Sequence, residues 1–351
     1  MKLSIVSFTL NGIALSQKIA DAVDEMEYAL FTKCTTYDKD ERTVSYIEKS
    51  IGEWAKDELE ERNALIFIGA CGIAVRAIAP YLTDKLHDSP VLVMDETGRY
   101  VIPILSGHVG GANELALYLA KITGAEPVLT TATDVNHRFA VDVFAKKNEL
   151  AIVKKDGIAR VSAKVLSGEN ITMSVQTGHF ENMPQNGIVL TEYPPIKRVD
   201  VVITSENREF DTSLLLRPRE YGIGIGCRKG KDLKAVEAFI AKNLKKAGIS
   251  PIQVAALSSI DLKKEEPALL TWSKKEKIPF ITYTAEELRN VEGAFHKSGF
   301  VREQVGVDNV CERAAMRFCG PKGSLVYEKH AEDGMTIAIA RRDWSVKFDE
   351  E

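Results

Sequence analysis

Short runs of consecutive apolar residues alternate along the chain with longer segments in which apolar residues recur every three or four positions. Leu65–Ile68 is apolar throughout, as is typical of a strand covered on both faces. Gly110–Thr123 places its apolar residues on one helical face and is followed by Gly124, a common helix stop. This alternation predicts an α/β fold with mainly parallel sheets.

The first part of the chain follows this pattern to about residue 140. We expect strands at Lys2–Phe8, Leu65–Ile68, Val91–Met94 and Pro127–Thr130. We expect helices at Leu15–Asp24, Thr43–Glu61, Gly72–Tyr81 and Gly110–Thr123. Packed on both faces of one sheet, these helices would give a three-layer α/β/α domain.

The pattern weakens after residue 140 and returns near Tyr221. Between these points, strand-like runs occur at Ile171–Val175, Gly187–Thr191 and Val199–Thr204. A second α/β pattern then begins with the run Ile223–Gly226. The predicted organisation is therefore an N-terminal α/β domain at 1–140, a small strand-containing middle module at 141–215 and a second three-layer α/β/α domain at 216–351.

The composition excludes several classes of protein. The 351 residues carry a formal net charge of -4, which does not favour nucleic-acid binding. No apolar run reaches the roughly 20 residues of a membrane span. The five cysteines form no CxxC pair, so neither a disulfide framework nor a zinc ribbon is expected, and a reducing cytoplasm fits best. The histidines lack ligand spacing, so we expect no metal held by the protein.

The segment Ser106–Asn113 is the most informative stretch. Its three glycines allow backbone amides to approach a ligand, and the helix that follows favours an anion. His108 lies among these glycines and could act as a general acid or base. Alternatively, it could cap the helix or bond a neighbouring loop. The turn has neither the GxGxxG order nor the Gly-Lys-Ser/Thr ending, so a dinucleotide or a P-loop nucleotide is not indicated.

Other polar groups follow strands predicted in the same domain. Arg76, in the helix after Gly72, could bind a carboxylate or form a surface ion pair. Asp95 follows Val91–Met94, and Asp134 ends the segment 130–134. Either carboxylate could orient water, although Asp134 could instead cap a helix. Because parallel strands end at one edge of a sheet, we expect these groups and the Ser106–Asn113 turn to line one crevice.

The C-terminal domain offers a second candidate anion site. Gly226 precedes Cys227, Arg228 and Lys229 at the end of a predicted strand. Two cations beside backbone amides favour an anion, whereas the alternative is a solvated charged surface. Two serines of this region, Ser258 and Ser259, follow a neighbouring strand.

These motifs together resemble a known family. Residues 72–80, 105–113 and 130–134 are similar to the N-terminal domain of the cobalt-precorrin-5A hydrolases of anaerobic cobalamin biosynthesis. Residues 222–230 and 258–261 resemble their C-terminal domain. The middle module matches by position only, and Ala74-Val75 stands where two valines are expected.

The resemblance implies a reaction. These enzymes open a δ-lactone between the ring A acetate and the extruded meso carbon of a cobalt-bound corrinoid, and then release acetaldehyde to give cobalt-precorrin-5B. Because the substrate carries the cobalt, we expect no protein cofactor. Besides the corrinoid intermediate, neighbouring pathway enzymes or a second copy of the chain are candidate partners.

The resemblance also organises the candidate residues. The predicted catalytic groups are His108, Asp134 and Asp95, with backbone amides near Gly110 and Gly111 holding the oxyanion. The predicted substrate-binding residues are Gly72, Arg76, Ser106, Gly107, Gly110, Gly111, Asn113, Thr131, Thr133, Gly226, Arg228, Lys229, Ser258 and Ser259. One alternative is a non-catalytic corrinoid carrier; another, from the turns alone, is a sugar-phosphate enzyme.

Overall fold

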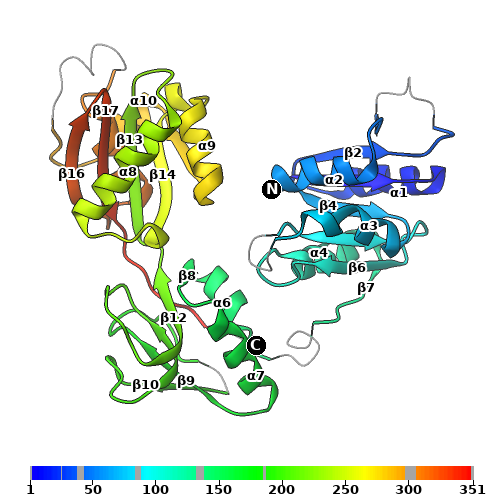
Figure 1. Ribbon diagram of the computed structural model, residues 1–351, viewed down its shortest axis with the longest axis horizontal. Coiled ribbons are helices and arrows are strands. Elements are labelled where there is room, and N and C mark those ends of the chain that lie inside the picture. The colour runs from blue at the N-terminus through cyan, green and yellow to red at the C-terminus, as the bar shows by residue number, and fades with distance from the viewer. Residues whose placement is uncertain are drawn as a thin grey trace. The chain divides into compact units, whose positions relative to one another are not determined.

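The computed structural model describes residues 2–24, 26–37, 43–83, 88–131, 138–184, 187–296 and 306–348. The chain divides into two compact units, Met1–Val143 and Phe144–Glu351 (Figure 1). The strands within these described residues form one seven-stranded and two five-stranded sheets, each packed with helices. The predicted α/β class, with a small additional sheet in the middle of the chain, is confirmed.

The first unit is built on the seven-stranded sheet, in the order β3-β2-β1-β4-β5-β6-β7. Its strands are β1 (Leu3–Ser7), β2 (Tyr28–Thr32), β3 (Ser45–Tyr46), β4 (Ala64–Ile68), β5 (Val91–Met94), β6 (Tyr100–Leu105) and β7 (Glu126–Pro127). Its helices before residue 140 are α1 (Leu10–Ala22), α2 (Ile51–Glu60), α3 (Cys71–Ile78) and α4 (Ala112–Thr123). Neighbouring strands are parallel except β5 and β6, which run antiparallel.

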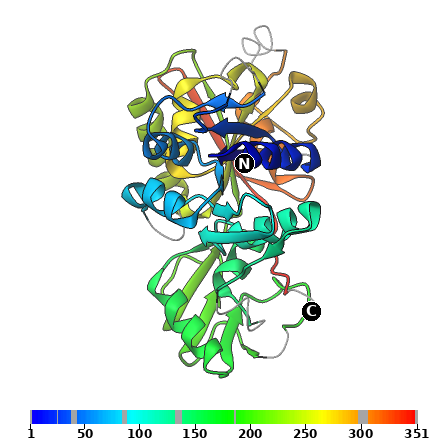
Figure 2. The same cartoon turned by 90° about the vertical axis from the view of Figure 1, so that its right-hand side faces the viewer.

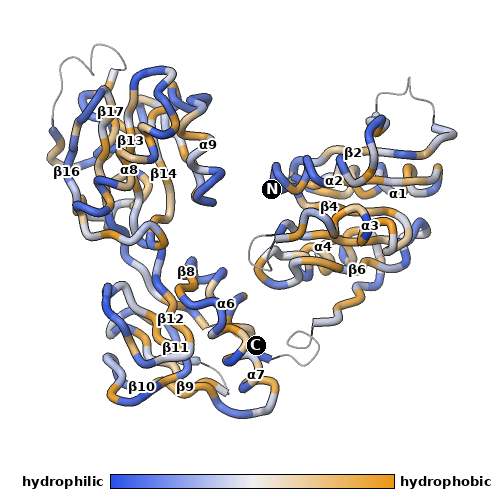
Figure 3. The backbone as a smooth tube through the Cα atoms, in the orientation of Figure 1, coloured by the Kyte–Doolittle hydropathy of each residue, from blue (hydrophilic) through white to orange (hydrophobic). Residues whose placement is uncertain are grey.

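Apolar side chains fill both faces of this sheet. Ile66 of β4 packs in a core with α1 and α4, whereas Leu65 and Phe67 pack in a second core with α2 and α3. Alternate residues of a strand point to opposite faces, so a strand apolar at every position joins both cores. The layers can be followed in Figures 1 and 2, and the hydropathy of their segments in Figure 3.

Three predicted elements of this unit differ clearly from the structure. The helix expected at Leu15–Asp24 already begins at Leu10, because Thr9 caps it. The helix expected at Thr43–Glu61 begins only at Ile51, because Ser50 caps it: the Ser50 hydroxyl accepts from the Glu53 amide at 3.2 Å. Residues before the cap form β3, which extends the sheet beside β2. The strand expected at Pro127–Thr130 is shorter and lies at Glu126–Pro127.

The second unit contains the other two sheets. The middle sheet has the order β10-β9-β11-β12-β8, and only β8 runs antiparallel to its neighbour. Its strands are β8 (Leu150–Ile152), β9 (Ile171–Val175), β10 (Ile188–Thr191), β11 (Val199–Ile203) and β12 (Thr212–Pro218). The helices of this region are α6 (Val141–Lys147), whose first three residues belong to the first unit, and α7 (Asp156–Leu166). Both were missed, although Ile158, Val161 and Val165 of α7 are buried at helical spacing.

The last sheet has the order β15-β14-β13-β17-β16 and is mixed, because β17 is antiparallel to both of its neighbours. Its strands are β13 (Tyr221–Cys227), β14 (Val254–Ile260), β15 (Phe280–Tyr283), β16 (Ser324–Glu332) and β17 (Met335–Arg341). The helices of this region are α8 (Leu233–Ala247), α9 (Pro267–Glu276), α10 (Ala285–Arg289) and α12 (Val310–Cys319). Helices α8 and α9 pack on one face, and α12 packs on the other against β13.

Glycines of β13 allow α12 to lie directly on the strand. A Cβ placed on Gly224 would fall 1.8 Å from the Cys311 carbonyl oxygen, and one on Gly222 would fall 2.4 Å from Phe318 Cδ1. Such distances are far inside van der Waals contact. These two glycines therefore serve helix packing rather than a ligand.

A buried carboxyl group between β12 and β13 should make stability depend on pH. Burial raises the pKa of Glu220 to about 7, although Arg341 and the Tyr221 hydroxyl favour the ionised form. In the unfolded chain this carboxyl ionises near 4.5. As the pH rises from 4.5 to 7, the unfolded state loses its proton first, so the contribution of Glu220 to folding stability decreases.

We therefore expect Glu220→Gln to raise the free energy of unfolding at pH 8 by up to about 3 kcal/mol and to have little effect at pH 4. Urea denaturation of both proteins at the two pH values measures this difference. Equal changes at both pH values would contradict the proposed cause.

Candidate functional site

The Ser106–Asn113 turn is tightly closed. Ser106 adopts a positive φ of 56°, and its hydroxyl donates to the Asp88 carbonyl oxygen at 2.7 Å. The carbonyl of Ser106 accepts from the Ala112 amide at 3.1 Å. A Cβ on Gly110 would lie 2.2 Å from Ser106 Cβ, so only glycine fits there.

The amides of this turn are only partly available to a ligand. Those of Gly111 and Asn113 donate to the carbonyl oxygens of His108 and Gly107, both at 3.0 Å. Within the described residues, the Gly110 amide has no such internal acceptor. Of the amides predicted to hold an oxyanion, that of Gly110 is therefore the better candidate.

His108 lies beside a carboxylate that the sequence analysis did not select. Its Nδ1 is 3.5 Å from Oδ1 of Asp142, and the two side chains are 14% and 10% exposed. Oδ1 of Asp142 also accepts from the Val143 amide at 3.1 Å. The sequence did contain a signal for Asp142, because it is the single acidic residue within the apolar run 139–145. A charge in such a run is expected to be buried and therefore to need a partner.

Asn113 joins this turn to the third predicted segment. Its side chain is buried, and Nδ2 donates to Thr131 Oγ1 at 3.1 Å. Thr133 and Asp134 lie outside the described residues. The structure thus brings together His108, Asn113, Thr131 and, additionally, Asp142.

The prediction that all the polar turns line one crevice is wrong. Because β6 is antiparallel to β5, Leu105 pairs with Val91, where β5 begins. The turn after Leu105 therefore lies at the end of the sheet where β4 and β5 begin, and not at the end where these two strands finish. Gly72, Arg76 and Asp95 follow those ends and lie away from His108.

The groups at that opposite edge have local partners. Asp95 accepts from the Tyr100 amide at 2.7 Å and from the Thr97 amide at 3.1 Å. Burial acts to raise the pKa of Asp95, but the hydrogen bond from the Thr97 hydroxyl and those from the two amides outweigh it and leave the pKa lowered. Exposed Arg76 donates to the Gly72 carbonyl oxygen at 3.2 Å. Asp95 thus stabilises the turn between β5 and β6.

The second unit contains a cavity of about 510 Å³ at the ends of β13 and β14. Three of the predicted residues line it, namely Gly226, Arg228 and Ser259. The hydroxyl of Ser259 donates to the Ile225 carbonyl oxygen at 2.7 Å. Ser258 is fully buried and donates to a neighbouring strand, and Lys229 is exposed outside the cavity lining.

The cavity also contains residues that the sequence analysis missed. Lys263, Asn309 and Lys329 line it, although they lie far apart in the chain. The pairing of β16 with β17 and the position of α12 bring these residues together. No local sequence motif therefore indicated that they belong to one site.

Two kinds of feature are not found among the described residues. Within them, no group of three or more His, Cys, Asp or Glu side chains could hold a metal ion. Among the helices formed by these residues, none has the length and apolarity needed to cross a membrane.

Comparisons with known proteins match both ends of the chain. The family model described as "Cobalamin synthesis G N-terminal" matches residues 53–134, and "Cobalamin synthesis G C-terminus" matches residues 221–340. A solved structure titled as a putative cobalamin biosynthesis protein G homolog from Sulfolobus solfataricus aligns over 97% of each chain, with 19% identity and a TM-score of 0.41.

Curated relatives match over almost the entire length. The cobalt-precorrin-5A hydrolase of Salmonella typhimurium is 33% identical over 96% of this chain and 97% of its own. The enzyme of the same name from Priestia megaterium is 30% identical over 96% and 94%. The chain therefore belongs to the cobalt-precorrin-5A hydrolase family.

Proposed function

We propose that this hydrolase opens the ring A δ-lactone of cobalt-precorrin-5A and releases acetaldehyde to give cobalt-precorrin-5B. The observation that carries the proposal is the similarity, over nearly the whole chain, to two hydrolases named for that substrate. Lactone opening requires an activated water and a donor for the tetrahedral oxyanion. The first unit offers an imidazole and a glycine-rich turn for these tasks.

In this proposal His108 is the acid–base group. Because Asp142 lies beside Nδ1 of His108, it favours the tautomer with the proton on Nδ1. The unprotonated Nε2 can then take a proton from water. The water oxygen bonds to the lactone carbonyl carbon, and the Gly110 amide donates to the oxyanion. Collapse of this intermediate breaks the acyl–oxygen bond, and the leaving oxygen receives the proton from Nε2.

The second stage uses the hydroxyl that lactone opening releases. His108 Nε2 removes its proton while the bond between the hydroxyethyl carbon and the macrocycle breaks. The oxygen electron pair forms the acetaldehyde carbonyl, and the electrons of the broken bond remain on the macrocycle. Cobalt belongs to the substrate and would help to accept that charge, so the proposal needs no cofactor held by the protein.

The direct test is to incubate the purified chain with the cobalt-containing lactone and to measure acetaldehyde with an alcohol dehydrogenase coupled to NADH. One acetaldehyde per corrinoid converted supports the proposal. A change in the corrinoid absorption spectrum without acetaldehyde would indicate the carrier alternative instead.

A further inference from the structure

The cavity of the second unit is formed by four segments distant in sequence. Its walls come from the ends of β13 and β14, the first residues of α12, and the turn between β16 and β17. Ile260, Val310 and Met335 supply apolar side chains to the lining. This combination of apolar walls and a few charged groups is typical of a small-molecule site.

Five charged side chains line the cavity: Arg228, Lys263, Lys329, Glu332 and Asp333. Three of them have partners of opposite charge. Lys263 pairs with Glu266 at 3.1 Å, Glu332 with Lys242 at 2.7 Å and Asp333 with Lys231 at 2.6 Å.

The other two charged groups are both cations. Within the part of the chain that the structure describes, neither Arg228 nor Lys329 forms an ion pair with a carboxylate. Lys231 makes the larger contribution to the electrostatic lowering of the pKa of Asp333, and the contribution of Arg228 is smaller. The cavity therefore presents two cations whose charge its own carboxylates do not neutralise by direct contact.

Both cations are on well-anchored backbone. The Arg228 amide donates to the Gly334 carbonyl oxygen at 3.0 Å. The Arg228 side chain packs against Gly334 so closely that a Cβ added to this glycine would lie 2.9 Å from Arg228 Cδ. The Lys329 amide donates to Oε1 of Glu312 at 2.8 Å. Gly334 thus gives the arginine stem room beside the β16–β17 turn.

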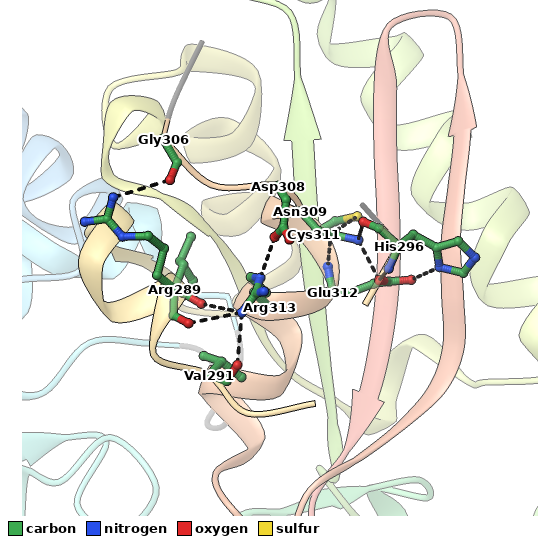
Figure 4. A network of polar contacts seen from close by, with 10 residues as sticks. Arg289, Val291, His296, Gly306, Asp308, Asn309, Cys311, Glu312 and Arg313 are labelled. Atoms are coloured by element: carbon green, nitrogen blue, oxygen red, sulfur yellow. Dashed lines mark hydrogen bonds and ion pairs between the residues drawn. The ribbon is translucent and has the colours of Figure 1, made fainter. Parts of the chain in front are cut away.

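Glu312 holds the backbone of Lys329 in place through that hydrogen bond. Its contacts with His296 and Asn309 are shown in Figure 4. This fully buried carboxylate also accepts from the His296 amide at 2.9 Å, from His296 Nδ1 at 2.8 Å and from Asn309 Nδ2 at 2.5 Å. Burial acts to raise the pKa of Glu312, but the hydrogen bonds from Lys329 and His296 outweigh it and lower the pKa. The ionised carboxylate therefore joins β16 to the start of α12 on either side of the cavity lining.

We propose that this cavity binds a ligand with at least two carboxylates beside an apolar edge, and that Arg228 and Lys329 each pair with one of them. Two cations from separate elements suit separate carboxylates, and the Arg228 guanidinium can bind one in a bidentate manner. This inference rests on the proposed function, in which the ligand is the corrinoid and the carboxylates are its peripheral acetates and propionates.

Binding of cobyrinic acid, a corrinoid with free carboxylates, to the full chain tests this inference. We expect Arg228→Gln and Lys329→Gln each to raise its Kd about tenfold or more, because each removes one charge pair in a partly enclosed site. Cobyrinic acid heptamethyl ester, which has the same ring without the charges, should bind the unaltered chain at least about tenfold more weakly than the acid. Lys234→Gln, at an exposed position of α8 outside the cavity, is the matched control and should leave Kd unchanged.

A Glu312→Gln variant tests the placement of Lys329, and we expect it to weaken binding of the acid but not of the ester. If that variant fails to fold, the two cation variants still decide the matter. Equal binding of acid and ester, or unchanged Kd in both cation variants, would overturn the inference. Failure of the proposed function would give a different result. The acid would bind through both cations, but the lactone would yield no acetaldehyde.

Discussion

His108→Ala is expected to slow acetaldehyde release by about 10²–10⁴-fold, the usual contribution of a positioned acid–base group. The imidazole would act in both stages, so the variant should accumulate unopened lactone rather than the opened intermediate. Mass spectrometry separates these species because opening adds one water. Corrinoid binding should persist, since the proposed carboxylate site belongs to the second unit.

His330→Ala is the matched control for this experiment. His330 is exposed on β16, stacks on Tyr327 and is not part of the cavity lining. A rate close to that of the unaltered chain is therefore expected. If His108→Ala released acetaldehyde at a near-normal rate, the imidazole would have no part in catalysis.

Gly224→Val is expected to lower the free energy of unfolding by about 3 kcal/mol or to prevent folding of the last domain. The first added carbon would already lie 1.8 Å from the Cys311 carbonyl oxygen and 2.8 Å from the Ala315 nitrogen. Both are backbone atoms of α12, so the helix would have to move off β13. Urea denaturation followed by circular dichroism measures the loss.

Gly52→Ala in α2 provides the comparison for that substitution. Its nearest neighbours would be the Ala77 carbonyl oxygen at 3.8 Å and the Tyr81 hydroxyl at 3.9 Å, which are ordinary contacts. Because alanine loses less backbone entropy than glycine in a helix, we expect a gain of about 0.5 kcal/mol. A Gly224→Val protein as stable as this variant would disprove the close packing of α12 on β13.

The sequence allowed the α/β class and most core strands of the first unit to be predicted. Leu65–Ile68 falls within β4, and Val91–Met94 is β5, because strands covered on both faces are apolar throughout. The pattern of apolar and polar residues does not indicate in which direction a strand runs within its sheet. Tyr100–Leu105 has the composition of a strand whichever way it runs, yet its antiparallel course moves His108 to the other edge.

The candidate site was harder to predict for a related reason. Glycine permits close approach of a backbone, but the sequence does not say whether a ligand or a helix approaches it. At Gly224 the approaching group is α12, whereas Gly226 lines the cavity. Asp142 and Lys329 were missed because their relevance depends on contacts between segments distant in sequence.

In the proposed reaction, water adds to the lactone carbonyl before acetaldehyde leaves. A single turnover of the cobalt-containing lactone in H₂¹⁸O tests it most directly, with the ring A acetate analysed by mass spectrometry. We predict one ¹⁸O atom in that carboxylate for each acetaldehyde released. Acetaldehyde formed without ¹⁸O in the carboxylate would contradict the account.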